Sequence, residues 1–177
     1  MLYRLLPLLL AAVALGGCNY NPPYVDEETR NPPKPADLVG TYSLSDETLV
    51  HSAALVDGDP YKPGTVLKAQ DGSKASVHQL MLRSDGTFSA VNIPLWKGGF
   101  AEGWTIKSFQ SGVGTWSITG SKSDDWSYSF IPSNFKLIPN DNRTRIDLLG
   151  HNPPYTILFF YGAEPDDDSA MLFTKEK

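Results

Sequence analysis

The feature that most constrains the fold is a period-two alternation of apolar side chains from Leu38 to the C-terminus. Gly, Pro, Asn and Asp interrupt this alternation about every eight to fifteen residues. Such a pattern is typical of short antiparallel strands joined by turns, and no window has the 3.6-residue period of a convincing amphipathic helix. The strands expected from it are 38–44, 77–83, 87–93, 113–119, 126–130, 135–138, 145–149, 155–161 and 170–174.

The expected strands define an all-β domain over residues 38–177. Asp85-Gly86 lies between the two clearest strands and supplies the positive φ of a hairpin turn. Segment 155–161 is apolar on both faces, which indicates a central strand covered on each side. Because an open sheet of this size leaves edges exposed, we expect an antiparallel up-and-down barrel of about 8–10 strands, with a β-sandwich as the alternative. Segment 47–56 is compatible with a strand or a short helix.

The N-terminus has the layout of a secretory signal. Arg4 supplies a positive charge, an apolar run covers residues 5–15, and small residues precede Cys18. The run is well short of the roughly 20 residues that a helix needs to span a bilayer. We therefore expect residues 1–17 to be a cleaved signal peptide.

Residues 15–18, Leu-Gly-Gly-Cys, resemble the lipobox of bacterial lipoproteins. The resemblance implies that Cys18, the only cysteine of the chain, carries lipid and that cleavage occurs just before it. An ordinary secreted protein is the alternative. Several acyl chains give stable membrane anchoring, so the expected location is the cell envelope. In a Gram-negative cell, Asn19 favours the outer membrane, on its periplasmic or its surface face.

Residues 18–37 follow as the lipidated cysteine and a proline-rich tether. Five prolines and four acidic residues, with almost no aliphatic ones, predict an extended spacer. At about 3.1 Å per residue in the polyproline conformation, such a spacer reaches roughly 60 Å. Removal of the first 17 of the 177 residues leaves 160, which suits this tether and one domain.

Charge narrows the range of partners. The formal net charge of −5 becomes −6 once Arg4 is removed with the signal, and lysine and arginine form no dense cluster. Nucleic acid is therefore not an expected partner. Since the single cysteine is assigned to lipid, we also expect no disulfide inside the domain.

Residues 37–42, Asp-Leu-Val-Gly-Thr-Tyr, resemble the opening of lipocalin-like barrels, with Tyr42 at the position of the usual tryptophan. The chain is also similar to a group of small uncharacterised bacterial lipoproteins at residues 80–88, 112–116 and 159–166, and at Pro94. These motifs are turns and strands. The resemblance thus implies a lipocalin-like β-barrel domain and no particular activity.

The chain has few residues arranged for catalysis or metal binding. His51, His78 and His151 lie on separate elements without the spacing of metal ligands, and a position in a turn or at the surface is the simpler interpretation of His78 and His151. Residues 166–168, three aspartates, lack the order of a calcium loop and fit a hairpin tip. A serine-nucleophile elbow is also missing. We predict no catalytic residue, no metal site, no cofactor and no enzymatic activity.

Residues 96–104, Trp-Lys-Gly-Gly-Phe-Ala-Glu-Gly-Trp, combine glycines with large aromatics, and they are interpreted as a loop. At a barrel mouth, Trp96, Phe100 and Trp104 could stack on a small ligand. Alternatively, their rings fold back as a lid on the core. The sequence therefore predicts a lipid-anchored protein that binds a small apolar ligand in its barrel. Binding of another envelope protein through the outer surface, as in an accessory or immunity lipoprotein, is the alternative.

Overall fold

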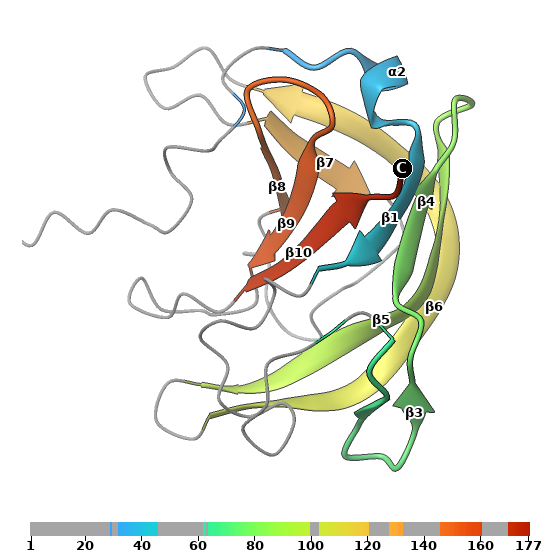
Figure 1. Cartoon of the computed structure of the whole chain (residues 1–177), viewed down its shortest axis with the longest axis vertical. Helices are drawn as coiled ribbons and strands as arrows, with labels where there is room; N and C mark the ends of the chain where they lie inside the picture. The colour runs from blue at the N-terminus through green and yellow to red at the C-terminus, as the bar shows by residue number, and fades with distance from the viewer. Residues whose placement is uncertain are drawn as a thin grey trace, which may run out of the picture.

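The chain forms an eight-stranded antiparallel barrel with a small additional hairpin (Figure 1). The computed structural model describes residues 29, 32–45, 62, 64–99, 103–120, 128–132, 146–160 and 170–177. Its elements are α2 (Pro35–Leu38), β1 (Gly40–Leu44), β2 (Leu67–Lys68), β3 (Lys74–Ala75), β4 (Gln79–Leu82), β5 (Thr87–Gly99), β6 (Gly103–Gly120), β7 (Tyr128–Pro132), β8 (Ile146–Leu149), β9 (Thr156–Phe160) and β10 (Ala170–Lys175).

The barrel closes in the order β1-β10-β9-β8-β7-β6-β5-β4, with β4 pairing back onto β1. From β4 to β10 every strand pairs with its successor in the chain, and all pairs are antiparallel. The hairpin β2–β3 is inserted between β1 and β4 and forms its own two-stranded sheet. This topology confirms the predicted all-β up-and-down barrel, and the closed ring of strands differs from the two packed sheets of a sandwich.

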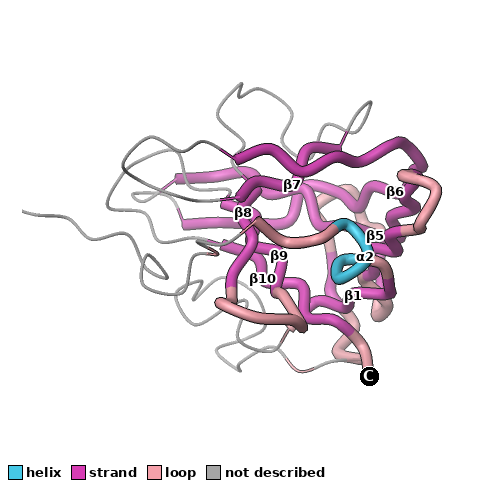
Figure 2. Tube along the Cα trace, turned by 90° about the horizontal axis from the view of Figure 1, so that it is seen from above, coloured by secondary structure: helices cyan, strands magenta, loops and turns pink. Residues whose placement is uncertain are grey.

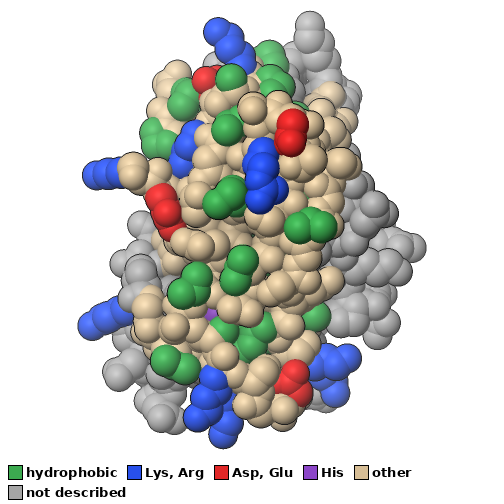
Figure 3. Space-filling view, turned by 90° about the vertical axis from the view of Figure 1, so that its right-hand side faces the viewer, with side chains coloured by type: hydrophobic (Ala, Val, Ile, Leu, Met, Phe, Trp, Pro, Cys, Tyr) green, Lys and Arg blue, Asp and Glu red, His purple; other side chains and the backbone are tan. Residues whose placement is uncertain are grey.

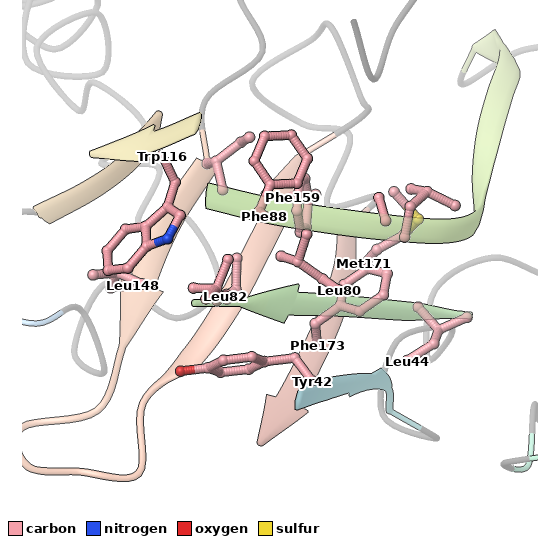
Figure 4. Packing of buried hydrophobic residues seen from close by; sticks show 14 of the residues in the cluster. Tyr42, Leu44, Leu80, Leu82, Phe88, Trp116, Leu148, Phe159, Met171 and Phe173 are labelled. Atoms are coloured by element: carbon pink, nitrogen blue, oxygen red, sulfur yellow. The ribbon is translucent and has the colours of Figure 1, made fainter. Parts of the chain in front are cut away.

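The barrel interior is filled by the inward half of the alternating residues. Phe88 lies opposite Gly114 of β6, so the absence of a side chain on the glycine leaves room for the ring. Phe159 and Phe173 meet edge to face with ring centroids 5.2 Å apart. Figure 4 shows large side chains from opposite strands pointing toward one another: Tyr42, Leu80, Leu82, Phe88, Trp116, Leu148, Phe159, Met171 and Phe173, all at most 9 % exposed.

Strand β9 is buried on both faces, as its sequence predicts. Ile157 and Phe159 belong to the interior cluster, whereas Leu158 belongs to a second buried cluster on the outer face of the barrel. The same second cluster contains Leu149 of β8 and Leu172 of β10. The three strands β8, β9 and β10 therefore have no water-facing side at these positions, which explains their almost continuous apolar sequence.

Two hairpin turns share the sequence Asp-Gly followed by a hydroxyl residue. In the β4–β5 turn, Asp85 Oδ1 accepts hydrogen bonds from the amide and the hydroxyl of Thr87, at 2.9 and 2.7 Å. Asp71 accepts the same pair of bonds from Ser73 in the β2–β3 turn. Because these bonds stabilise the ionised form, the pKa of each aspartate is lowered, in both cases chiefly by the side-chain hydrogen bond. The β2–β3 hairpin is not among the strands expected from the alternation of apolar residues.

The chain ahead of β1 lies against the barrel. We call Thr29 and residues 32–38 the strap; it contains α2, which lies at the upper end of the barrel in Figure 1 and close to β1 in Figure 2. Leu38 is fully buried in the core cluster, and its carbonyl accepts a 2.9 Å hydrogen bond from the hydroxyl of Tyr42. The carbonyl of Asp37 accepts another from Lys175 Nζ. These contacts connect the end of the predicted tether firmly to the barrel.

Candidate functional site

The segment predicted as an aromatic loop is a β-hairpin. Trp96 lies on β5 opposite Ile106, and Trp104 lies on β6 opposite Gly98. Residues 100–102 connect the two strands. Phe100 lies outside the described residues. The loop interpretation is therefore wrong, because Gly98, Gly99 and Gly103 lie within paired strands and do not mark a flexible connection.

The position of Trp96 agrees with the alternative in which the aromatics cover the core. Its side chain is 3 % exposed and belongs to the interior cluster, together with Ile93 and Ile106 of the same hairpin. In Figure 1 this half of the hairpin extends below the other barrel strands. The β2–β3 turn is attached to it, because the amide of Gln70 donates a 2.9 Å hydrogen bond to the carbonyl of Ile106.

A β-bulge marks the start of this extension. The register of β5 against β6 shifts between Ala90 and Ile93, and Asn92 adopts a left-handed φ of 49°. The Asn92 amide donates to Ser111 Oγ at 2.9 Å, and its Nδ2 donates to the carbonyl of Val77 at 3.2 Å. Such bulges bend a strand and increase its twist. The bulge at Asn92 therefore changes the direction of the hairpin where it extends beyond the barrel.

His78 contacts this bulge and is buried, so its predicted position at the surface is wrong. It is 2 % exposed, its Nδ1 lies 2.7 Å from the carbonyl of Asn92, and its ring packs near Phe109. Burial lowers the pKa of His78, because removal from water disfavours the charged ring. His151 lies exposed after β8, as expected for a turn residue. Within the described part of the chain, no three His, Cys, Asp or Glu residues group as metal ligands.

The strand residues on the outer face of β4, and of β5 and β6 within the barrel, are uncharged, and the charged side chain of Arg83, just after β4, reaches this face. Met81, Ser89 and Val113 lie side by side on the three strands, and Val91 lies in the next row opposite Gln79. We call this surface the β4–β6 face. Its outward residues are Val77, Gln79, Met81, Thr87, Ser89, Val91, Ser111, Val113, Thr115, Ser117 and Thr119, none of which carries a charge.

Four apolar side chains of the β4–β6 face are exposed to water. Val113 is 74 % exposed, and Val77, Met81 and Val91 are 40–49 % exposed. Neighbouring strands lie about 4.8 Å apart, so Met81 and Val113, two strands apart, are within roughly 10 Å of each other. Figure 3 shows separate hydrophobic groups on this side of the molecule, with charged side chains among and around them. Sequence alternation could have found these residues, because they occupy the outward positions of predicted strands.

An open depression adjoins one margin of this face. It has a volume of about 450 Å³ and lies between the start of β1, the end of β4 and the β4–β5 turn. Met81 contributes to both the depression and the β4–β6 face, while Arg83 and Asp85 supply its charges. Arg83 donates a 3.0 Å hydrogen bond to Ser89 of β5. Because Ser89 lies between Met81 and Val113, the guanidinium of Arg83 lies on the β4–β6 face.

Comparisons with protein families, with curated proteins and with solved structures gave no match. In the part of the chain that the structure describes, no helix is long and apolar enough to cross a bilayer. Cys18 and the aspartates at 166–168 lie outside the described residues. Function is therefore inferred from the sequence of the N-terminus and from the geometry of the barrel.

Proposed function

We propose that this chain is a lipid-anchored, non-catalytic protein of the cell envelope that binds another protein through its β4–β6 face. The anchor is the lipid on Cys18, which the lipobox resemblance at residues 15–18 implies. The observation that carries the binding function is the exposure of Met81, Val91 and Val113 on one face of the sheet. Of the alternatives raised by the sequence, this observation favours contact through the outer surface.

The energetics support a protein partner. Burial of a fully exposed Val or Met side chain contributes about 1.5–3 kcal/mol. Val113, which is 74 % exposed, can gain most of this, whereas Met81 and Val91, about 40 % exposed, can gain less than half. The cores of protein interfaces are depleted of charged residues and have a polar rim. The β4–β6 face has exposed apolar groups such as Val113, together with one charged group, Arg83, on Ser89. The partner therefore presents an apolar patch of its own.

The binding function is tested with a photo-cross-linking amino acid at position 111, beside Val113, in cells that carry the full chain. We expect one cross-linked envelope protein, and we expect Val113→Glu to remove it. Val66→Glu is the matched control, because Val66 is 58 % exposed but lies ahead of β2, outside the face. Retention of the cross-link by Val113→Glu, or its equal loss in both variants, contradicts the proposal.

The lipid anchor is tested separately by fractionation of cells that express Cys18→Ser. The wild-type chain is expected in the membrane fraction, and the variant in the soluble extract, because it lacks the thiol that takes the lipid. A variant that stays in the membrane fraction like the wild type argues against the lipobox interpretation.

A small apolar ligand is the second candidate, and the extended end of the β5–β6 hairpin is where it would bind, although Trp96 itself is buried in the core there. Ile93, Trp96 and Ile106 form an apolar group at the end of the barrel opposite α2. Native mass spectrometry of the chain purified from its own host is the measurement. A stoichiometric small molecule that is lost in Trp96→Ala supports this function, whereas a bare chain mass argues against it.

A further inference from the structure

The methionines of the barrel lie in opposite environments. The chain has three methionines, of which Met1 belongs to the expected signal peptide. Met171 is 1 % exposed inside the barrel, whereas Met81 is 41 % exposed on the β4–β6 face. Because an oxidant must reach the sulfur of a thioether to react with it, the folded chain offers Met81 to the solvent and shields Met171.

The surroundings of Met81 suit a small oxidant and a polar product. Met81 lines the open depression of about 450 Å³ beside the start of β1, through which a small molecule can approach its side chain. Met81 also pairs with Ser89, whose hydroxyl accepts a 3.0 Å hydrogen bond from Nη2 of Arg83. The guanidinium therefore lies beside Met81. An arginine has five N–H donors, and this bond uses one of them.

We propose that Met81 is a site of oxidation by peroxides, and that its sulfoxide switches off binding of the partner at the β4–β6 face. This inference rests on the proposed function, because it adds a regulation of the same surface. In the reaction, a lone pair of the Met81 sulfur attacks the terminal oxygen of a hydroperoxide, so that an S–O bond forms and the O–O bond breaks. The proton of the terminal oxygen moves to the leaving oxygen. The sulfur is oxidised by two electrons, and the peroxide is reduced to an alcohol, or to water in the case of hydrogen peroxide.

The oxidised side chain is polar and stays on the face. A sulfoxide oxygen accepts hydrogen bonds, and the guanidinium of Arg83 offers donors beside it. The polar group then lies next to Ser89, between the strands that carry Met81 and Val113, where the partner contributes its apolar patch. Covering a polar group with an apolar surface has a free-energy cost that covering a thioether does not have. The barrel itself stays folded, because Met81 belongs to neither buried cluster.

The oxidation site is tested on the full chain, purified from its host in detergent and treated with hydrogen peroxide. Peptide mass mapping is expected to show addition of one oxygen atom to Met81 at least about tenfold faster than to Met171, because burial protects the latter. In concentrated urea the two methionines should react at similar rates. Equal rates in the folded chain, or loss of its circular dichroism spectrum when only Met81 is oxidised, overturns the inference.

The switch is tested in cells that carry the full chain with the photo-cross-linking amino acid at position 111. The readout is the cross-link yield after brief treatment with hydrogen peroxide, divided by the yield without it. This ratio is expected to be about one tenth in the parent and in Met171→Leu, because the sulfoxide weakens the interface. It is expected to stay at about one in the matched control Met81→Leu, which has an apolar side chain of similar volume without sulfur. In untreated cells, Met81→Gln should give less cross-link than Met81→Leu.

The outcomes separate this inference from the proposed function. Absence of any cross-link in untreated cells with the parent chain contradicts both. A cross-link that peroxide leaves unchanged while Met81 is oxidised overturns the inference alone. An equal loss of the cross-link in the parent and in Met81→Leu also overturns the inference, because the oxidised group then lies outside Met81.

Discussion

Replacement of Tyr42 by phenylalanine removes the hydroxyl that connects the barrel core to α2. The hydroxyl donates a 2.9 Å hydrogen bond to the carbonyl of Leu38, and both residues are fully buried. The ring remains in place in the variant, so the packing of the aromatic face is preserved. The carbonyl of Leu38 loses this donor in an environment without water.

The expected cost follows from that loss. A buried polar group left without its partner costs about 1–3 kcal/mol, and a typical hydrogen bond contributes about 1 kcal/mol net. We therefore expect Tyr42→Phe to lower the free energy of unfolding by about 1–2 kcal/mol. For a domain of this size the melting temperature falls by roughly 2–4 °C per kcal/mol, which gives a decrease of roughly 2–8 °C.

Urea unfolding followed by tryptophan fluorescence measures the change, with Tyr155→Phe as the matched control. Tyr155 is also buried, but its hydroxyl forms no hydrogen bond within the described part of the chain. Its replacement is expected to change the free energy by less than about 0.5 kcal/mol. If the two variants unfold at the same urea concentration, the Tyr42 bond does not hold α2 and the reasoning is refuted.

The stability of the same variant is also expected to depend less on pH in the alkaline range. Burial raises the pKa of Tyr42, because the phenolate is disfavoured away from water. Above about pH 10 the unfolded chain loses this proton while the folded chain retains it, so the free energy of unfolding falls as the pH rises. Tyr42→Phe removes this contribution, and its stability is expected to decline less than that of the parent between pH 9.5 and 11.

Three further changes test the bulge, the Asp-Gly turn and the core. The buried His78 has a lowered pKa, so stability is expected to fall as the pH drops below about 6.5, where the unfolded histidine takes up a proton; urea titrations from pH 7.5 to 5.5 should show a shallower slope for His78→Gln, and an unchanged slope contradicts the assignment. Gly86 has a φ of 80° with open space around its α-carbon, so Gly86→Ala is expected to cost about 1–2 kcal/mol from backbone strain alone, and Gly86→Asn less; equal thermal unfolding of the two variants argues against strain. Phe173 is fully buried against Phe159, and Phe173→Ala is expected to cost about 3–5 kcal/mol in the same assay, with Phe173→Leu as the milder control; a loss below about 1 kcal/mol excludes tight packing there.

Most of the barrel could be predicted from alternation and turn chemistry. The outward Val113 and the inward Trp116 have the alternating positions expected within 113–119, and Gly86 adopts the positive φ expected of an Asp-Gly turn. These features are local, because side-chain direction in a strand and φ in a turn depend on neighbouring residues. The Asp71-Gly72 turn has the same Asp-Gly dipeptide, which by the same reasoning predicts the β2–β3 hairpin.

The remaining features depend on contacts that are distant in sequence. The bulge at Asn92 shifts the alternation by one position, so the extension from Pro94 to Gly99 no longer matched the pattern of the strand before it. The burial of Thr29 depends on carbonyl groups more than a hundred residues away, and its acidic, proline-rich surroundings indicate a spacer. The composition of a segment indicates its local conformation, and it does not predict hydrogen bonds to distant residues such as Leu148 and Gly150.

Attachment of Thr29 to β8 also sets how freely the domain can explore the space above a membrane. With the lipid on Cys18, as proposed, about eleven residues of the tether lie between the lipid and Thr29, whereas the whole predicted tether has about nineteen. At about 3.1 Å per residue, the maximum distance between lipid and barrel is therefore roughly 34 Å instead of roughly 60 Å. Since effective concentration falls roughly as the −3/2 power of linker length, the effective concentration of the domain toward neighbouring envelope proteins rises about twofold.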